Sequence, residues 1–340
     1  MEKKYNVAVV GATGLVGECF LEILAERHFP VERLYPLASE RSEGNSVLFN
    51  NQAHTVENTE GFDFSQVDIA FFSAGGSVSE KYAPIAADAG CIVIDNTSCF
   101  RYQDDIPLVI PEVNPEALAD YRNRNIIANP NCSTIQMLVA LKPIYDAVGI
   151  TRINVATYQA VSGAGRKSIE ELARQTAELL NGQEAVISAF PKQIAFNVLP
   201  HIDTFQDNGY TREEMKMVWE TQKILNDSQI TVNPTAVRVP VFFGHSEALH
   251  IETDRLISPE EVSVLLANAP GVTVIEDQDY PTAISHAASH DSVFVGRIRK
   301  DISHPHGIDL WVVSDNVRKG AALNAIQIAE MITSNSLYLH

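Results

Sequence analysis

The segment GATGLVG at residues 11–17 is the strongest fold signal in the N-terminal half. It joins a β-branched run at Asn6–Val10 to a helix-like segment at Gly14–His28. Its glycines permit a tight turn and a close backbone approach to a ligand, and the helix N-terminus offers unpaired N–H groups to a pyrophosphate. The spacing GxxGxxG differs from the commoner GxGxxG. Its place between a strand and a helix nevertheless favours dinucleotide binding over a purely structural turn.

The end of the second predicted strand bears on which dinucleotide is bound. An acidic residue there would hold the ribose hydroxyls of NAD. Here the segment reads ASERS at residues 38–42, in which Arg41 and two hydroxyls stand beside Glu40. This favours the extra phosphate of NADP. The alternative is that Arg41 is an ordinary solvated cation and Glu40 holds the ribose.

In the first third of the chain, short β-branched runs alternate with helical patterns, as in parallel βαβ units. This pattern predicts a Rossmann-like, doubly wound α/β domain. The predicted strands are Asn6–Val10, Leu34–Ala38, Asp68–Ser73, Cys91–Asp95 and Ile126–Ala128, with helices at Gly14–His28 and Val78–Ala89.

After about Thr151 the strands become longer and alternate strictly, which predicts an α+β domain with a mixed sheet that has one buried face. The predicted elements are strands at Arg152–Val161, Ala236–Phe243, Ser292–Ile302 and Ile308–Ser314, a helix at Ser168–Leu180, and a helix starting at Thr211 in a capping box. The last apolar helix, Lys319–Ile332, is long enough to pack back on the first domain. We therefore expect residues 1–131 plus 316–340 to form an NADP-binding domain and residues 132–315 a second domain, to which the family resemblance given below assigns catalysis and dimerisation.

Composition and charge exclude several classes of protein. The 340 residues carry 25 Lys and Arg against 43 Asp and Glu, a formal net charge of −18, so nucleic acid is an unfavourable partner. We expect neither a signal peptide nor a membrane span. Four scattered cysteines predict a reducing, cytoplasmic location. His304 and His306 resemble a ligand pair, but no carboxylate or thiol cluster accompanies them, and we expect no metal.

Cys132 is the reactive thiol that the sequence predicts. It follows NPN at residues 129–131 and opens an apolar helix running toward Val148, and a helix N-terminus stabilises a thiolate. Cys19 and Cys91 lie in apolar patterns that predict inert buried thiols. A single cysteine is more often structural. A catalytic role for Cys132 therefore needs support from other residues.

Three further side chains support a catalytic role for Cys132. Gln159 lies on an alternating strand that leads into the flexible loop SGAG at residues 162–165. Arg238 is embedded in an apolar run, where an unpartnered cation is unfavourable. His245 follows Gly244 at a strand end and could act as an acid or base, although its spacing alone favours an ordinary capped loop histidine.

Taken together, these motifs closely resemble the aspartate-β-semialdehyde dehydrogenase family over essentially the whole length. The matching segments are GATGLVG, LASERSEG, DNTSCFR, IPEVNP, NPNCST, TYQAVSGAG, EEMKMVWETQKI, VRVPVFFGHSEALHIE and WVVSDNVRKGAA. The resemblance implies NADPH-dependent reductive dephosphorylation of L-aspartyl-4-phosphate to L-aspartate-4-semialdehyde, in the biosynthesis of lysine, threonine, methionine and diaminopimelate. It further implies a homodimer, sometimes a tetramer, that binds its small-molecule substrate and inorganic phosphate.

The resemblance also implies roles for individual residues. Cys132 would be the acylated nucleophile and His245 the acid/base, and Gln159 would orient the substrate. Arg238 and Glu213 would hold the amino-acid end of the substrate, and Arg101, Lys216 and Asn131 would form the phosphate site. The implied NADP contacts are Thr13, Gly14, Leu15, Val16, Ser39, Arg41, Ser42, Gly163 and Asn316.

Alternative interpretations remain open at this point. An N-acetyl-γ-glutamyl-phosphate reductase uses the same thioester chemistry, but its substrate has no free ammonium for Glu213 to bind. A glyceraldehyde-3-phosphate-type dehydrogenase lacks the EEMKMVWETQ and VRVPV pattern. An inactive paralogue that acts as a binding protein is disfavoured by the joint presence of Cys132, Gln159, Arg238 and His245.

Overall fold

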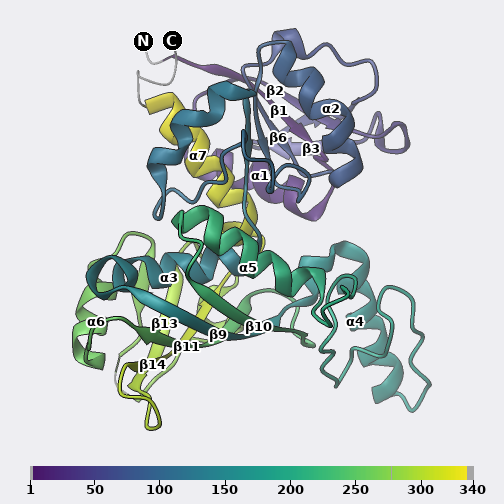
Figure 1. The fold of residues 1–340 in the computed structure, drawn as a ribbon. Coiled ribbons are helices and arrows are strands. Elements are labelled where there is room, and N and C mark those ends of the chain that lie inside the picture. The colour runs from purple at the N-terminus through teal and green to yellow at the C-terminus, as the bar shows by residue number, and fades with distance from the viewer. Residues whose placement is uncertain (1–2, 277, 335–340) are drawn as a thin grey trace. The chain divides into compact units, whose positions relative to one another are not determined.

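The computed structural model describes residues 3–276 and 278–334, which fall into two compact units (Figure 1). The first unit takes in the residues up to Pro130 and those from Ala321 onward, and the second is Asn131–Gly320. Asn131 and Asn316 therefore both belong to the second unit. The expected division by function, with 1–131 and 316–340 binding NADP, remains a prediction.

The first unit is built on a parallel sheet with the strand order β5-β2-β1-β6-β7-β8. Its strands are β1 (Tyr5–Val10), β2 (Val31–Ala38), β5 (Glu57–Asn58), β6 (Ile69–Phe72), β7 (Ile92–Asp95) and β8 (Ile126–Ala128). The order reverses at β1, and right-handed crossovers then place the connecting helices on opposite faces. This confirms the predicted doubly wound fold.

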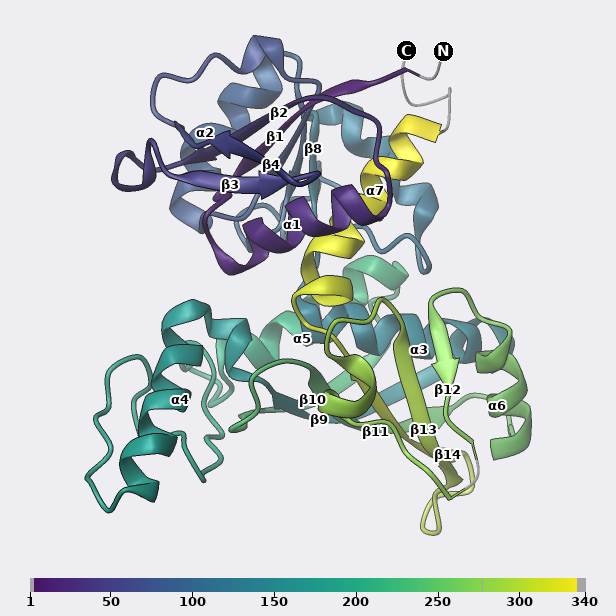
Figure 2. The same cartoon turned by 180° about the vertical axis from the view of Figure 1, so that it is seen from behind.

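Helices cover both faces of this sheet, and strands β6 and β8 are accordingly apolar and buried along their length. All four residues of β6 are buried. Helices α1 (Leu15–Glu26) and α7 (Leu323–Ser334) pack side by side on one face, and α2 (Gly76–Asp88) lies on the other, as comparison of Figures 1 and 2 shows. A small hairpin of β3 (Ser46–Phe49) and β4 (Gln52–Thr55), which the sequence pattern did not predict, stands beside the sheet.

The glycine loop takes its shape from two of its members. Gly11 has a φ of +93°, a conformation that favours glycine. Gly17 lies so close to the loop that a Cβ built on it would stand 2.0 Å from the carbonyl oxygen of Gly11. Gly14 is the N-cap of α1 and supplies no capping side chain. The loop therefore presents backbone at the start of an uncapped helix.

The second unit contains a mixed sheet with the strand order β10-β9-β11-β14-β13-β12. Its strands are β9 (Ile150–Gln159), β10 (Thr231–Arg238), β11 (His245–Thr253), β12 (Val272–Val274), β13 (Val293–Lys300) and β14 (Gly307–Ser314), and its helices are α3 (Cys132–Val148), α4 (Arg166–Leu180), α5 (Arg212–Leu225) and α6 (Pro259–Ala267). Residues 153, 155, 157 and 159 of β9 are all buried, which confirms the expected single buried face. Helix α3 packs against β9, β11 and β14.

Two sequence expectations about strands and helices were wrong in detail. The predicted strand Ala236–Phe243 ends at Arg238, because the chain turns away at Val239 and Pro240 offers no N–H to a sheet. His245 consequently opens the next strand, β11, instead of closing that one. The predicted helix Lys319–Ile332 begins with a π-helical turn at Arg318–Ala322, and α7 itself starts at Leu323.

Among the helices within residues 3–276 and 278–334, none combines the length and the hydropathy needed to cross a membrane.

The close approach at Gly17 leads to a stability prediction. Gly17→Ala should lower the free energy of unfolding by about 2 kcal/mol, because the added Cβ overlaps the Gly11 carbonyl and the helix must move away. Gly76→Ala, in the first turn of α2 with open space around its Cβ position, is the control and should change stability by less than about 1 kcal/mol. Urea denaturation of both variants tests this, and equal midpoints would contradict it.

Candidate active site

Cys132 stands in the first position of α3, and Asn131 is the N-cap of that helix. The Oδ1 atom of Asn131 accepts hydrogen bonds from the N–H groups of Ser133 at 3.0 Å and Thr134 at 3.4 Å. The Asn131 N–H itself donates to Glu220 Oε2 at 2.6 Å. The Cys132 sulfur is therefore fixed at the positive end of a capped helix, which favours a thiolate.

The backbone of Ala160, directly after Gln159, holds two of the predicted site residues. Its N–H donates to His245 Nδ1 at 3.0 Å, and its carbonyl oxygen accepts from Arg238 Nη1 at 2.7 Å. The side chains of Gln159, Arg238 and His245 are each at least nine-tenths buried. The ends of β9 and β10 and the start of β11 thus bring three residues together that are far apart in the sequence.

The contact with Ala160 fixes the protonation state of His245. A ring nitrogen that accepts a hydrogen bond carries no proton, so the neutral ring bears its proton on Nε2. Burial, reinforced by the positive charge of Arg238, lowers the pKa of His245 to about 3. Between its ordinary value of 6.5 and about 3 the unfolded chain binds a proton that the folded chain does not, so this residue makes stability fall as the pH drops through that window.

The proton on Nε2 is the chemically informative feature of His245. The Nε2 atom is buried and has no hydrogen-bond partner within the described part of the chain. A Cβ built on Gly163 would stand 3.2 Å from Nε2 and 3.0 Å from Arg238 Nη1. The space that Gly163 leaves open is therefore bordered by a neutral N–H donor and a guanidinium.

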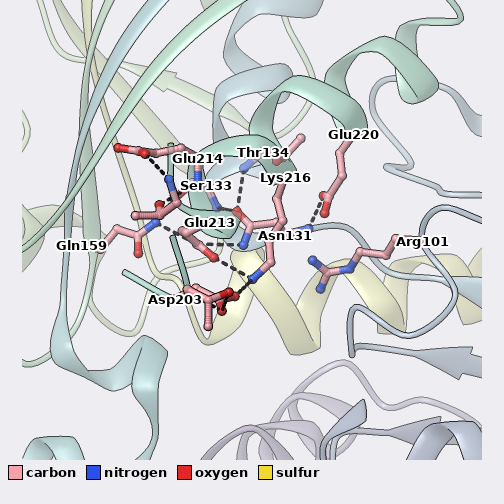
Figure 3. A network of polar contacts seen from close by, with 12 residues as sticks. Arg101, Asn131, Ser133, Thr134, Gln159, Asp203, Glu213, Glu214, Lys216 and Glu220 are labelled. Carbon is pink, nitrogen blue, oxygen red and sulfur yellow. Dashed lines mark hydrogen bonds and ion pairs between the residues drawn. The ribbon is translucent and has the colours of Figure 1, made fainter. Parts of the chain in front are cut away.

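Glu213 is the centre of a buried ionic network on α5 (Figure 3). Its Oε1 accepts hydrogen bonds from Asn131 Nδ2 at 2.9 Å and Gln159 Nε2 at 3.1 Å, and its Oε2 pairs with Lys216 Nζ at 2.8 Å. Burial alone would raise the pKa of Glu213, but the Lys216 ammonium and the two amide donors outweigh burial and lower it to about 2. Glu213 is therefore ionised at neutral pH.

The predicted shared helix face of Glu213 and Lys216 is thus confirmed by an ion pair. Lys216 also pairs with Asp203 Oδ2 at 2.9 Å, and this second carboxylate was not among the predicted site residues. The predicted capping box is confirmed as well, with Thr211 as N-cap and Glu214 as its partner.

Cys132 has two further close neighbours in the second unit. The guanidinium of Arg238 and the Cys132 sulfur interact electrostatically. A Cβ on Gly320, in the π-helical turn, would stand 2.8 Å from the Cβ of Cys132. No sequence pattern pointed to Gly320, where the lack of a Cβ lets the backbone pack directly on Cys132.

Asn316, a predicted cofactor residue, joins two loops of the site. Its Nδ2 donates to Ser162 Oγ at 2.9 Å, and its Oδ1 accepts from the Gly244 N–H at 3.0 Å. The loop that carries Gly163 is therefore tied to the residue that precedes His245.

The predicted cofactor residues of the first unit surround the end of β1 and β2. The loop at Thr13–Gly14 leads into the uncapped N-terminus of α1, and Gly14 is exposed. Ser39, Glu40 and Arg41 are exposed in a short 3₁₀ turn after β2. Because β1 and β2 are parallel neighbours, both loops lie at the carboxyl edge of the sheet, where dinucleotides bind. The residues present fit a dinucleotide with an added phosphate.

Arg101 belongs to the first unit, on the loop that follows β7. Asp95 organises this loop by accepting from Ser79 Oγ at 2.7 Å and from the Thr97 N–H at 3.1 Å. Arg101 Nη2 donates to the carbonyl oxygen of Asn96 at 3.1 Å.

Two other cysteines and the histidine pair have ordinary structural surroundings. Cys19 and Cys91 are buried, as expected, and burial raises the pKa of the Cys91 thiol. His306 Nδ1 lies 2.9 Å from the carbonyl oxygen of Thr253. Within residues 3–276 and 278–334 there is no group of three or more His, Cys, Asp or Glu that could hold a metal ion.

Comparison with known proteins bears on what this arrangement does. Residues 6–121 match the family model described as "Semialdehyde dehydrogenase, NAD binding domain", and residues 141–319 match "Semialdehyde dehydrogenase, dimerisation domain". The chain is 65% identical over 333 residues to the aspartate-semialdehyde dehydrogenase of Shewanella violacea, and the match covers 98% of both.

Solved structures agree with the sequence matches. The crystal structure of aspartate semialdehyde dehydrogenase II complexed with ASA from Vibrio cholerae is 64% identical, with a TM-score of 0.98 over 98% of this chain and 100% of that one. An aspartate semialdehyde dehydrogenase with NADP from Candida albicans is 26% identical, with a TM-score of 0.78 over 97% of this chain and 98% of that one. The two matched family models, one over each compact unit, define a dehydrogenase. This chain belongs to the semialdehyde dehydrogenase family.

The space at Gly163 supports a prediction for the semialdehyde dehydrogenase reaction. Gly163→Ala should lower kcat/KM by at least about tenfold, because the methyl group fills the space beside His245 Nε2 and Arg238 Nη1. The thermal midpoint should stay within a few degrees, since residue 163 needs no left-handed backbone. Steady-state kinetics with melting curves checks both, and unchanged kinetics would show that this space is not used.

Proposed function

We propose that this chain catalyses the NADPH-dependent, reversible reductive dephosphorylation of L-aspartyl-4-phosphate to L-aspartate-4-semialdehyde through a thioester on Cys132. The observation that carries the proposal is the site itself: a cysteine at a capped helix N-terminus interacts with the guanidinium of Arg238, and Arg238 shares the Ala160 peptide with a neutral imidazole whose proton is on Nε2. Membership in the semialdehyde dehydrogenase family supports the same activity. The reaction serves the biosynthesis of lysine, threonine, methionine and diaminopimelate.

The amino-acid end of the substrate binds to two opposite charges. Arg238 holds the α-carboxylate, for which the forked guanidinium has the matching geometry. Glu213 holds the ammonium, and its lowered pKa keeps it ionised for that purpose. Both Nε2 hydrogens of Gln159 are committed, to Glu213 and to Ser133 Oγ at 2.7 Å, so its Oε1 remains to accept from the substrate.

The acyl step begins at Cys132. Its thiolate attacks the acyl carbon, the C–O bond to phosphate breaks, and the phosphate leaves with the bonding electrons. Arg101, Lys216 and Asn131 bind the leaving phosphate, whose charge is near −2. Lys216 brings a charge already shared between Glu213 and Asp203, so binding phosphate weakens its pairing with these carboxylates.

NADPH, when bound, supplies a hydride to the thioester carbonyl carbon. Thr13, Gly14, Leu15 and Val16 hold its pyrophosphate region, and Ser39, Arg41 and Ser42 hold the 2′-phosphate, with Gly163 and Asn316 as the remaining contacts. The neutral Nε2–H of His245 donates to the oxyanion of the resulting tetrahedral adduct. Collapse of this adduct returns electrons to the sulfur and releases the aldehyde.

We further propose that the chain works as a cytoplasmic homodimer, with a tetramer as the larger form. The match of residues 141–319 to a dimerisation domain supports the dimer. The functional division proposed is an NADP-binding domain of residues 1–131 plus 316–340 and a catalytic domain of residues 132–315.

The ionised state of Glu213 and the setting of Cys132 argue against the two alternative functions. An N-acetylated substrate has no ammonium, so it would leave the carboxylate without a counterpart in the substrate. A binding protein without activity would have no need of a Cys132 that interacts with Arg238, nor of an imidazole held in one tautomer by Ala160.

The activity test follows the reverse reaction. The purified chain should reduce NADP in the presence of aspartate semialdehyde and phosphate, and the rate should be at least about tenfold lower with NAD at equal concentration. Cys132→Ala should lower kcat by more than about a thousandfold and leave NADP binding unchanged, because it removes only the nucleophile. Cys91→Ala is the matched control and should retain activity. No turnover by the folded wild-type chain would overturn the proposed function.

A further inference from the structure

Glu247 is a buried carboxyl group that the proposed reaction does not use. It lies on β11 two residues after His245, so both side chains point to the same face of the strand, where α3 packs. Its exposed fraction is zero, and neither of its carboxyl oxygens makes a hydrogen bond of ordinary length and angle within the described residues, although Ser133 and Gln136 lie near it.

The neighbours of Glu247 are polar but uncharged. Gln136 and Ser133, three residues apart on α3, lie close enough to favour its ionised form, yet burial outweighs them and raises the pKa of Glu247 well above its usual range. Thr157 stands directly opposite Glu247 in the pairing of β9 with β11. The side-chain polar atoms of Gln136 and Thr157 are likewise buried without a partner in the described part of the chain.

These four residues, Ser133, Gln136, Thr157 and Glu247, form what we call the Glu247 cluster. An ionised carboxylate in such surroundings would be a buried, uncompensated charge, which is far more costly than a neutral carboxyl group. A carboxylate there would also lie next to Ser133, beside the nucleophile Cys132, and would oppose its thiolate. Both considerations favour a proton on Glu247.

Ser133 connects the cluster to the proposed substrate site. Its Oγ accepts from Gln159 Nε2 at 2.7 Å, so the hydroxyl hydrogen is left to be donated elsewhere. The carbonyl oxygen of a neutral Glu247 is a suitable acceptor for it, and the carboxyl O–H can be donated to Gln136 Oε1. The direction of the Ser133 hydroxyl then determines which way the Gln159 amide faces.

We propose that Glu247 is a positioning residue, held as a neutral carboxylic acid, that orients Ser133 and through it the substrate-facing amide of Gln159. The proposal rests on the proposed function for its kinetic consequence but not for the protonation state. It distinguishes Glu247 from Glu213, which is also buried on the same site but is ionised and paired with Lys216.

Isosteric and truncating variants separate the two roles of the carboxyl group. Glu247→Gln keeps a carbonyl acceptor and a donor without charge, and should retain kcat within about threefold. Glu247→Ala removes both, and should lower kcat at least about tenfold, with a smaller change in KM. Glu252→Gln, further along β11, is the control and should match wild type. A loss in Glu247→Gln as large as that in Glu247→Ala would overturn the proposal.

A double-mutant cycle tests whether Glu247 acts through Ser133. Ser133→Ala should lower kcat as Glu247→Ala does, and the double variant should lose no more than the worse single variant, because both changes break one chain of contacts. Fully additive losses would contradict the proposal, since they would mean that Glu247 affects catalysis by a route other than Ser133.

Infrared spectroscopy tests the protonation state without any turnover. The wild-type minus Glu247→Gln difference spectrum at pH 7 should contain the carbonyl stretching band of a protonated carboxyl group. The difference is needed because burial also raises the pKa of Asp95. A carboxylate band in its place would overturn the proposal even in a fully active enzyme, and a protonated band in an inactive chain would separate it from the proposed function.

Discussion

The peptide of Ala160 is the constraint on which the candidate site depends. One residue donates its N–H to His245 and accepts at its carbonyl from Arg238, and it directly follows Gln159. The side chains of His245 and Arg238 are therefore positioned relative to Gln159 by a single peptide unit. This arrangement determines the imidazole tautomer and leaves a proton donor in the space beside Gly163. Loss of either contact would leave a buried polar group without its hydrogen-bond partner, and the side chain concerned would no longer be held in position.

Charge is distributed in the site with little net excess. The chain carries −18 overall, yet its proposed ligands are anions. Arg238 and Lys216 supply positive charge, Glu213 stays ionised because Lys216 and two amides hold it, and His245 stays neutral because Arg238 and burial disfavour a second cation. Glu247, without such partners, is best accommodated with a proton. Burial disfavours the ionised form of both Glu213 and Glu247. Only Glu213 has an ammonium group beside it, and only Glu213 is ionised.

Much of this could be predicted from the sequence, because local rules govern it. The glycine loop, the capping box at Thr211 and the position of Cys132 at a helix start depend on residues a few positions apart. The strand that was predicted to end at Phe243 was misplaced because alternation continues beyond the point at which the chain leaves the sheet. Ala160, Asp203 and Gly320 could not be found, since their importance lies in backbone contacts or in partners that only the folded chain brings near.

Ala160 holds His245 as a neutral ring with its proton on Nε2. Nitrogen NMR of the ¹⁵N-histidine-labelled chain, with the His245 signals assigned by their loss in His245→Gln, measures this directly. One ring nitrogen should be protonated and the other unprotonated, with the proton on Nε2, and the ring should not titrate from about pH 8 down to about pH 5. A midpoint near the ordinary histidine value of 6.5, or a proton on Nδ1, would contradict it.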